Sequence, residues 1–159
     1  MNLRISCLWA AAFIPAAIGQ SARGPIEGVW RAVEVTHGPA PGVTIKPGPN
    51  LAILTARHYS RIDVQTEKPR PLLTNPGSAS AEELRQVWGP VVAEAGTYEL
   101  TGNLITMRPV VAKNPAAMAP DVSIVYSYKL EGNTLTLVAQ RDLHGPVSSP
   151  LIVKLVRID

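Results

Sequence analysis

Two stretches of this chain share a pattern that constrains its fold more than any other feature. Residues 98–107 and 128–137 both read Tyr-x-Leu-x-Gly-Asn-x-x-Thr. Gly-Asn between two alternating segments is typical of a two-residue hairpin turn, because glycine adopts the positive φ that the first turn residue needs. Pairing outward from each turn predicts four opposed pairs: Leu100 with Ile105, Tyr98 with Met107, Leu130 with Leu135, and Tyr128 with Leu137. Each hairpin then has one apolar face and one polar face.

The same period-two test finds four more strands, at residues 28–35, 51–56, 59–64 and 151–158. Eight antiparallel strands in succession favour closure, which removes exposed edges and leaves an interior for side chains or one small ligand. An open sandwich is the alternative. One short helix is expected between a Ser80 N-cap and Gly89. We therefore predict an all-β fold, an eight-stranded antiparallel up-and-down barrel with one short helix.

The N-terminal segment has the composition of a secretory signal peptide. A positively charged start with Arg4 precedes an apolar run over residues 5–18, and small residues follow at 19–22. The run is too short to span a membrane as a helix. We expect a signal peptide over residues 1–22, a barrel domain over 23–159 with no membrane span, and a periplasmic or secreted location. Cys7, the one cysteine, would be lost with the signal.

Composition and motifs exclude several classes of protein. With 12 glycines and 15 prolines in 159 residues, the chain cannot form a long helical bundle or coiled coil. A formal net charge of +3 is too small and too dispersed to predict nucleic-acid binding. The three histidines are widely separated, so no metal site is expected. No nucleophile elbow or phosphate-binding loop is present, and no cofactor or catalytic residue is assigned.

Five segments together resemble the bacterial lipocalin-like domain family. They are Ile26-Glu27-Gly28-Val29-Trp30, Thr55-Ala56-Arg57-His58-Tyr59-Ser60, the Ser-Ala-Glu-Glu start of the helix, Gly96-Thr97-Tyr98-Glu99 and the hairpin at 130–137. The resemblance implies a small exported barrel, commonly without an assigned activity. It also implies that Trp30 packs at the closed end of the barrel. Strand parity places Arg157 on the inner face of the last strand, where it can lie over Trp30.

Three tyrosines and one methionine are candidate ligand-binding residues. Hairpin parity turns Tyr98, Met107, Tyr126 and Tyr128 toward the interior. Their apolar bodies with a few polar tips suit a cavity for a small, mostly apolar ligand. The alternative is that these side chains simply fill a small barrel. Neither the ligand nor the oligomeric state follows from the sequence.

His58 and Glu34 are the two polar candidates for the interior. His58 shares strand parity with Ile62 and Val64, which predicts that it faces inward, where a neutral imidazole can anchor a ligand or act as a general base. Glu34 shares parity with Trp30, although Val33 and Val35 leave the inner face of this strand ambiguous. Two functions remain open: an exported ligand-binding barrel, and a barrel enzyme of isomerase or cyclase type that uses His58 as acid or base.

Overall fold

The described part of the protein closes into a barrel. The computed structural model describes residues 24–39, 41–66 and 68–159. The strands of the ring follow sequence order, and each pairs antiparallel with its neighbour. They are β1 (Gly28–His37), β3 (Asn50–Leu54), β4 (His58–Val64), β5 (Val91–Thr101), β6 (Leu104–Ala112), β7 (Ile124–Glu131), β8 (Thr134–Asp142) and β10 (Leu151–Arg157). Because β10 pairs with both β1 and β8, the ring is complete. The predicted eight-stranded up-and-down barrel is confirmed.

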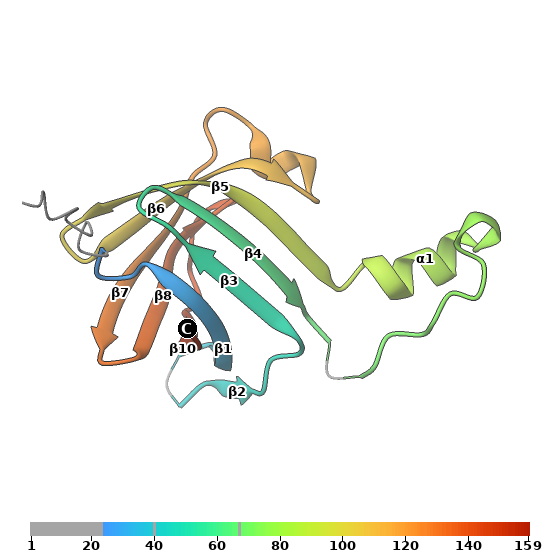
Figure 1. Cartoon of the computed structure of the whole chain (residues 1–159), viewed down its shortest axis with the longest axis horizontal. Helices are drawn as coiled ribbons and strands as arrows, with labels where there is room; N and C mark the ends of the chain where they lie inside the picture. Colours follow the sequence, from blue (N-terminus) through green and yellow to red (C-terminus); the bar gives the residue numbers. More distant parts are fainter. Residues whose placement is uncertain (1–23, 40, 67) are drawn as a thin grey trace, which may run out of the picture.

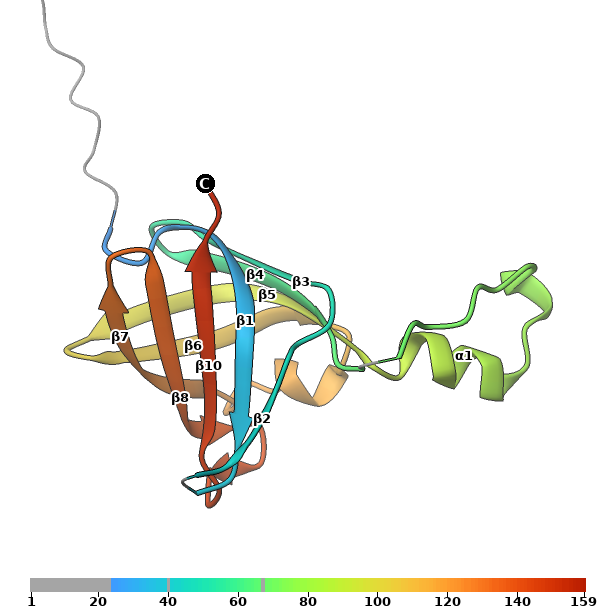
Figure 2. The same cartoon turned by 90° about the horizontal axis from the view of Figure 1, so that it is seen from below.

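Shorter elements pair with the ends of two barrel strands or lie in the connections between strands. β2 (Val43–Ile45) pairs with the end of β1, and β9 (Gly145–Pro146) pairs with the end of β8. Two 3-10 turns, η1 (Pro76–Ser78) and η2 (Pro115–Met118), lie in the connections before α1 and before β7. The helix α1 (Ala81–Trp88) projects away from the barrel on the long β4–β5 connection (Figures 1 and 2). None of its residues is buried.

The helix begins where the sequence predicts. The Ser80 side chain accepts a hydrogen bond from the Glu83 backbone N–H, and the Glu83 carboxylate accepts one from the backbone N–H of Ser80. This reciprocal capping box satisfies two donors that a helix start otherwise leaves unpaired. Hydrogen bonds from Ser80 also hold the pKa of Glu83 below its ordinary value. Local capping therefore supports α1 in place of tertiary packing.

Both predicted hairpins are present in the predicted register. Gly102 and Gly132 have φ of 59° and 58°, which fits a two-residue turn that begins with glycine. All four expected pairs are observed across β5–β6 and β7–β8. Their apolar members lie on the inner face, which fixes the register because a slip of one residue would turn that face outward.

A β-bulge in β1 reverses the predicted orientation of Glu34. The pairing with β10 runs from Ala32 opposite Leu155 to Glu34 opposite Lys154, so Val33 is an extra residue. The side chain of Asn50 bonds both backbone groups of Ala32 next to this bulge. Because the bulge shifts the alternation by one residue, Glu34 points outward and forms an ion pair of 3.2 Å with Lys154. The prediction that Glu34 faces the cavity is wrong.

The orientation predicted for β4 is also wrong. His58 and Ser60 are exposed, and the Ile62 side chain is 53% exposed on the outside. Tyr59, Arg61 and Asp63 point inward instead. Parity predicts that the more apolar set faces the core, whereas this strand turns its more polar set into the barrel. His58 therefore lies outside, and the enzyme hypothesis loses the residue on which it depended.

Candidate functional site

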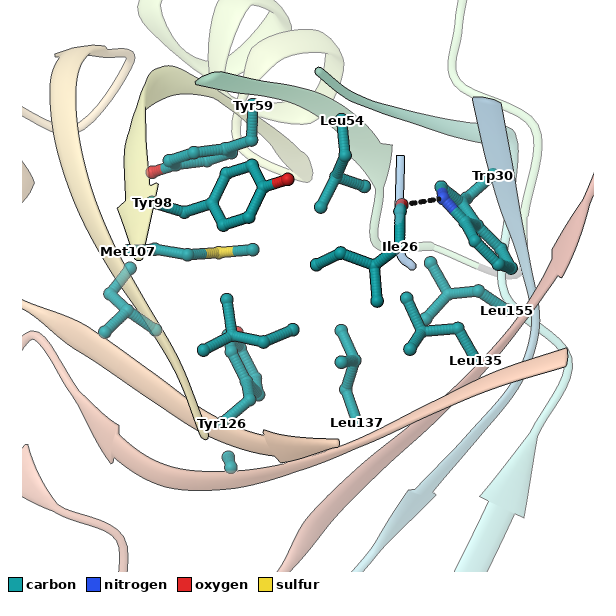
Figure 3. Close-up of a cluster of buried hydrophobic side chains, with 13 residues drawn as sticks. Ile26, Trp30, Leu54, Tyr59, Tyr98, Met107, Tyr126, Leu135, Leu137 and Leu155 are labelled. Carbon is teal, nitrogen blue, oxygen red and sulfur yellow. Dashed lines mark hydrogen bonds between the residues drawn. The ribbon is translucent and has the colours of Figure 1, made fainter. Parts of the chain in front are cut away.

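One end of the barrel is filled by side chains. Ile26 and Trp30 are fully buried there, and the Trp30 indole N–H donates to the Ile26 carbonyl oxygen at 2.9 Å. Figure 3 shows this bond at one side of the cluster of buried apolar side chains. The Arg157 guanidinium lies 4.3 Å from the centre of the Trp30 ring and donates to the carbonyl oxygens of Pro25 and Glu27. The expected contact of Arg157 with Trp30 is present.

Beyond this packed end, the barrel encloses a cavity of about 410 Å³. Most of its wall is aliphatic and comes from seven strands of the ring. The apolar lining comprises Ala32, Val35, Ile45, Ala52, Leu54, Val64, Ile105, Met107, Leu135, Leu137, Leu151, Val153 and Leu155. The loop residues Lys46, Pro47, Gly48 and Thr66 contribute to the lining near the ends of β1 and β4. The cavity therefore extends from the core toward the end of the barrel opposite Trp30.

A cluster of polar side chains occupies one wall of the cavity. Arg61 on β4 is paired directly across the sheet with Glu94 on β5. The Nε of Arg61 lies 3.0 Å from Oε1 of Glu94, which also accepts a hydrogen bond of 3.3 Å from the Tyr59 hydroxyl. Burial, together with the charge of Glu94, raises the pKa of Tyr59 well above its ordinary value. Tyr59 therefore remains a neutral donor to the Glu94 carboxylate.

Arg61 also reaches across the barrel. Its Nη1 donates to the hydroxyl of Tyr126 on β7 at 3.5 Å, although β5 and β6 separate the two strands in the sheet. The Nε–H of Arg61 is buried and has no hydrogen-bond partner of adequate geometry among the described residues. A buried donor in this state costs free energy. The Arg61 guanidinium is therefore held by its ion pair with Glu94, while its Nε–H donor makes no hydrogen bond of adequate geometry with the described residues.

Asp63 is the least firmly held member of the cluster. Its Oδ2 lies 3.9 Å from Nη1 of Arg61, and its side chain is 26% exposed on the cavity wall. Burial raises the pKa of Asp63; the Arg61 guanidinium opposes this shift and the Glu94 carboxylate adds to it. The cavity therefore presents a carboxylate that a ligand can approach.

The structure separates the four inward-facing candidates into two groups. Met107 and Tyr126 line the cavity. Tyr98 is buried in the packed core, where its hydroxyl donates to the Thr55 carbonyl oxygen at 2.6 Å, and Tyr128 packs against the same core. Neither Tyr98 nor Tyr128 lines the cavity. Glu34 and His58 lie outside it, as described above.

Sequence reasoning missed the residues that make the cavity polar. Tyr59, Arg61 and Asp63 alternate along β4, and Glu94 is opposite Arg61 on β5. A signal was available, because three successive polar or amphipathic residues with period two mark one face of a strand. The alternation shows that these three side chains share one face of the strand, but it does not show whether that face points into the barrel or away from it.

The described ranges contain neither a candidate metal site nor a candidate membrane-spanning helix. No group of three or more histidine, cysteine, aspartate or glutamate side chains there has a geometry that could hold a metal ion. No helix within those ranges combines the length and apolar character required to cross a bilayer. The predicted signal peptide at 1–22 lies outside the described residues.

Comparison with known proteins gives a structural likeness alone. No family model and no curated protein matches the chain. The chain is similar to a solved structure of a lipocalin-like protein from Bacteroides uniformis, with 15% sequence identity, a TM-score of 0.49, and coverage of 85% of this chain and 100% of that one. A closed up-and-down ring of eight strands is itself the architecture of lipocalins. The fold is lipocalin-like.

Proposed function

We propose that this protein is exported and binds a small, mostly apolar molecule inside its barrel. The observation that supports this proposal is the cavity of about 410 Å³ with an aliphatic wall and one polar cluster. Ligand pockets typically have volumes of roughly 300–1,000 Å³, apolar linings and a few convergent polar groups. Arg61, Asp63 and Tyr126 are such groups, and Met107 is an adaptable apolar contact.

A cavity-filling substitution tests the binding site. Ala52 lines the cavity, so Ala52→Phe places an aromatic ring where the ligand would lie. Ile62→Phe is the matched control, because Ile62 is exposed on the outside of a neighbouring strand. Titration with Nile red, a neutral apolar dye, should show binding by the wild type and Ile62→Phe and loss of binding by Ala52→Phe. Equal binding by all three proteins would place the dye outside the barrel.

Native mass spectrometry identifies what the protein carries. Gently purified wild-type protein should retain a small molecule that Ala52→Phe lacks, and a ligand panel that raises the melting temperature of the wild type alone would define its class. No bound mass and no thermal shift with any apolar compound would contradict the proposal.

The export part of the proposal is supported by the charged start and apolar run of residues 1–18. Expression with and without residues 1–22, followed by cell fractionation, tests it. Full-length protein should appear outside the cytoplasm and shortened by about the length of the predicted signal, while the truncated protein should remain inside.

A further inference from the structure

The polar wall of the cavity offers a donor and an acceptor side by side. The contacts of Arg61 with other described residues involve Nε and Nη1, and none involves Nη2. The Arg61 side chain is 28% exposed, and it lines the cavity. Two N–H groups on Nη2 are therefore available to an acceptor in the cavity. Among the described residues the Asp63 carboxylate contacts the Arg61 guanidinium alone, at 3.9 Å, so it is available to a donor in the cavity.

The charges of this wall do not favour an anion. Arg61 supplies one positive charge, and Glu94 already balances it at 3.0 Å. Asp63 adds a second carboxylate to the same cluster. Tyr59 and Tyr126 are the other titratable groups that contact the cluster, while Lys46 and His37 lie among the lining residues near the mouth. A ligand carboxylate beside Arg61 would therefore meet an uncompensated negative charge a few ångströms away.

The net charge of this wall does not itself exclude a cationic head group, but the positions of the charges and donors disfavour one. An ammonium beside Asp63 would lie close to the Arg61 guanidinium, because the two side chains are themselves only 3.9 Å apart. An ammonium also has no acceptor for the Nη2 donors, so they would remain unpaired in a dehydrated site. A neutral group with both an acceptor and a donor pairs with Arg61 and Asp63 together and adds no charge.

We propose that the cavity takes an amphipathic molecule with a neutral head group that both accepts and donates hydrogen bonds, and that Asp63 determines this selectivity by excluding anionic analogues. This inference rests on the proposed function, since it names the class of ligand for the same cavity. The acceptor atom of the head group lies against Nη2 of Arg61 and the Tyr126 hydroxyl. The donor lies against Asp63, and the apolar body contacts the aliphatic wall.

Three compounds that share an eight-carbon chain test the head group. Octanamide, octanoate and octylamine are titrated at pH 7.5 against wild-type protein that carries Nile red, and displacement of the dye reports the affinity of each. Octanamide should bind at least about tenfold more tightly than either charged compound. Equal affinities, or tightest binding by octanoate or octylamine, would overturn the inference.

Asp63→Asn tests the residue. It removes the negative charge and keeps the size of the side chain, so octanoate affinity should rise to within about threefold of that of octanamide. Asp121→Asn is the matched control, because Asp121 is exposed and does not line the cavity. This variant should keep the wild-type ratio of octanamide affinity to octanoate affinity. An unchanged ratio in Asp63→Asn would refute the role of Asp63.

The same experiment separates this inference from the proposed function. Nile red binding without the expected order of affinities contradicts the head-group class and leaves the binding function in place. Failure of Nile red and all three compounds to bind contradicts both. If Asp63→Asn does not fold, the order of the three affinities measured with the wild-type protein alone tests the head-group class.

Discussion

Removal of the charge on Glu94 should destabilise the protein far more than removal of a charge from an equally short surface ion pair. Arg61 and Glu94 lie 3.0 Å apart, and the Glu94 side chain is only 6% exposed. At an effective dielectric constant of about 20, their Coulomb attraction is about 5 kcal/mol, part of which offsets their dehydration. Breaking a buried pair typically costs about 3–5 kcal/mol, because the remaining charge is left without compensation.

For Glu94→Gln, the expected loss of unfolding free energy is somewhat smaller than the typical cost of breaking a buried pair. Arg61 is 28% exposed to the cavity, and Asp63 still lies 3.9 Å away as a partial substitute for Glu94. We therefore expect a loss of about 2–3 kcal/mol. Urea denaturation with an m-value of about 2 kcal/mol/M would show this loss as a shift of the midpoint by about 1–1.5 M.

A surface pair and a double-mutant cycle provide the controls. Lys129 and Glu131 lie 2.9 Å apart but are 70% and 63% exposed, so Glu131→Gln should cost less than about 0.5 kcal/mol. Arg61→Met and the double variant E94Q/R61M complete the cycle, and the double variant should be more stable than the sum of the two single losses predicts. Additive losses, or a Glu94→Gln loss no larger than that of Glu131→Gln, would refute the claim that burial strengthens this pair.

Three further predictions concern the closed end, the titration of the cavity and the barrel wall. Arg157→Met should cost about 1–3 kcal/mol and alter the Trp30 emission spectrum, because the cation–π contact and the bonds to two carbonyl oxygens are lost; an unchanged melting temperature would contradict this. The raised pKa of Asp63 gives a stabilising contribution that is complete below its ordinary value of 3.8 and is lost as the pH rises through the folded-state value. The stability of the wild type relative to Asp63→Asn should therefore fall as the pH rises above about 4. Urea midpoints of the two proteins that stay parallel across this rise would contradict the prediction. Gly96→Ala should strongly destabilise the protein, because its Cβ would meet the backbone oxygen of Arg108 across the bulge, whereas Gly77→Ala, whose nearest contact is 3.5 Å, should be nearly neutral in thermal unfolding.

Local chemistry explains why the hairpins and the helix could be predicted from the sequence. The turns at Gly102 and Gly132 require a positive φ that glycine adopts without strain. The start of α1 depends on Ser80 and Glu83, which are three residues apart. Each feature is decided by neighbours in the sequence, and the register of the hairpins then places Tyr98, Met107 and Tyr126 on the inner side.

The remaining errors arose where distant strands decide the outcome. The bulge at Val33 is visible only in the pairing of β1 with β10, which is more than a hundred residues away in the chain. The sequence shows only that Val33 and Val35 leave the inner face of this strand ambiguous, and parity with Trp30 then predicts the wrong face for Glu34. A single inserted residue has this effect because side-chain direction in a strand has period two.

The error in β4 has a different cause, and that cause bears on function. Arg61 and Glu94 cost free energy to bury, and apolar residues in their place would often give an equally or more stable core. Yet the outer surface beside them carries the apolar side chains of Leu51, Ile53 and Ile62, all at least 40% exposed. A chain selected only for stability would place these two sets the other way round. The polar inner face of β4 therefore supports the proposed binding function. We expect R61M/E94L to be more stable than the wild type and to bind octanamide more weakly, because the N–H donors of Arg61 are lost while Asp63 still repels octanoate.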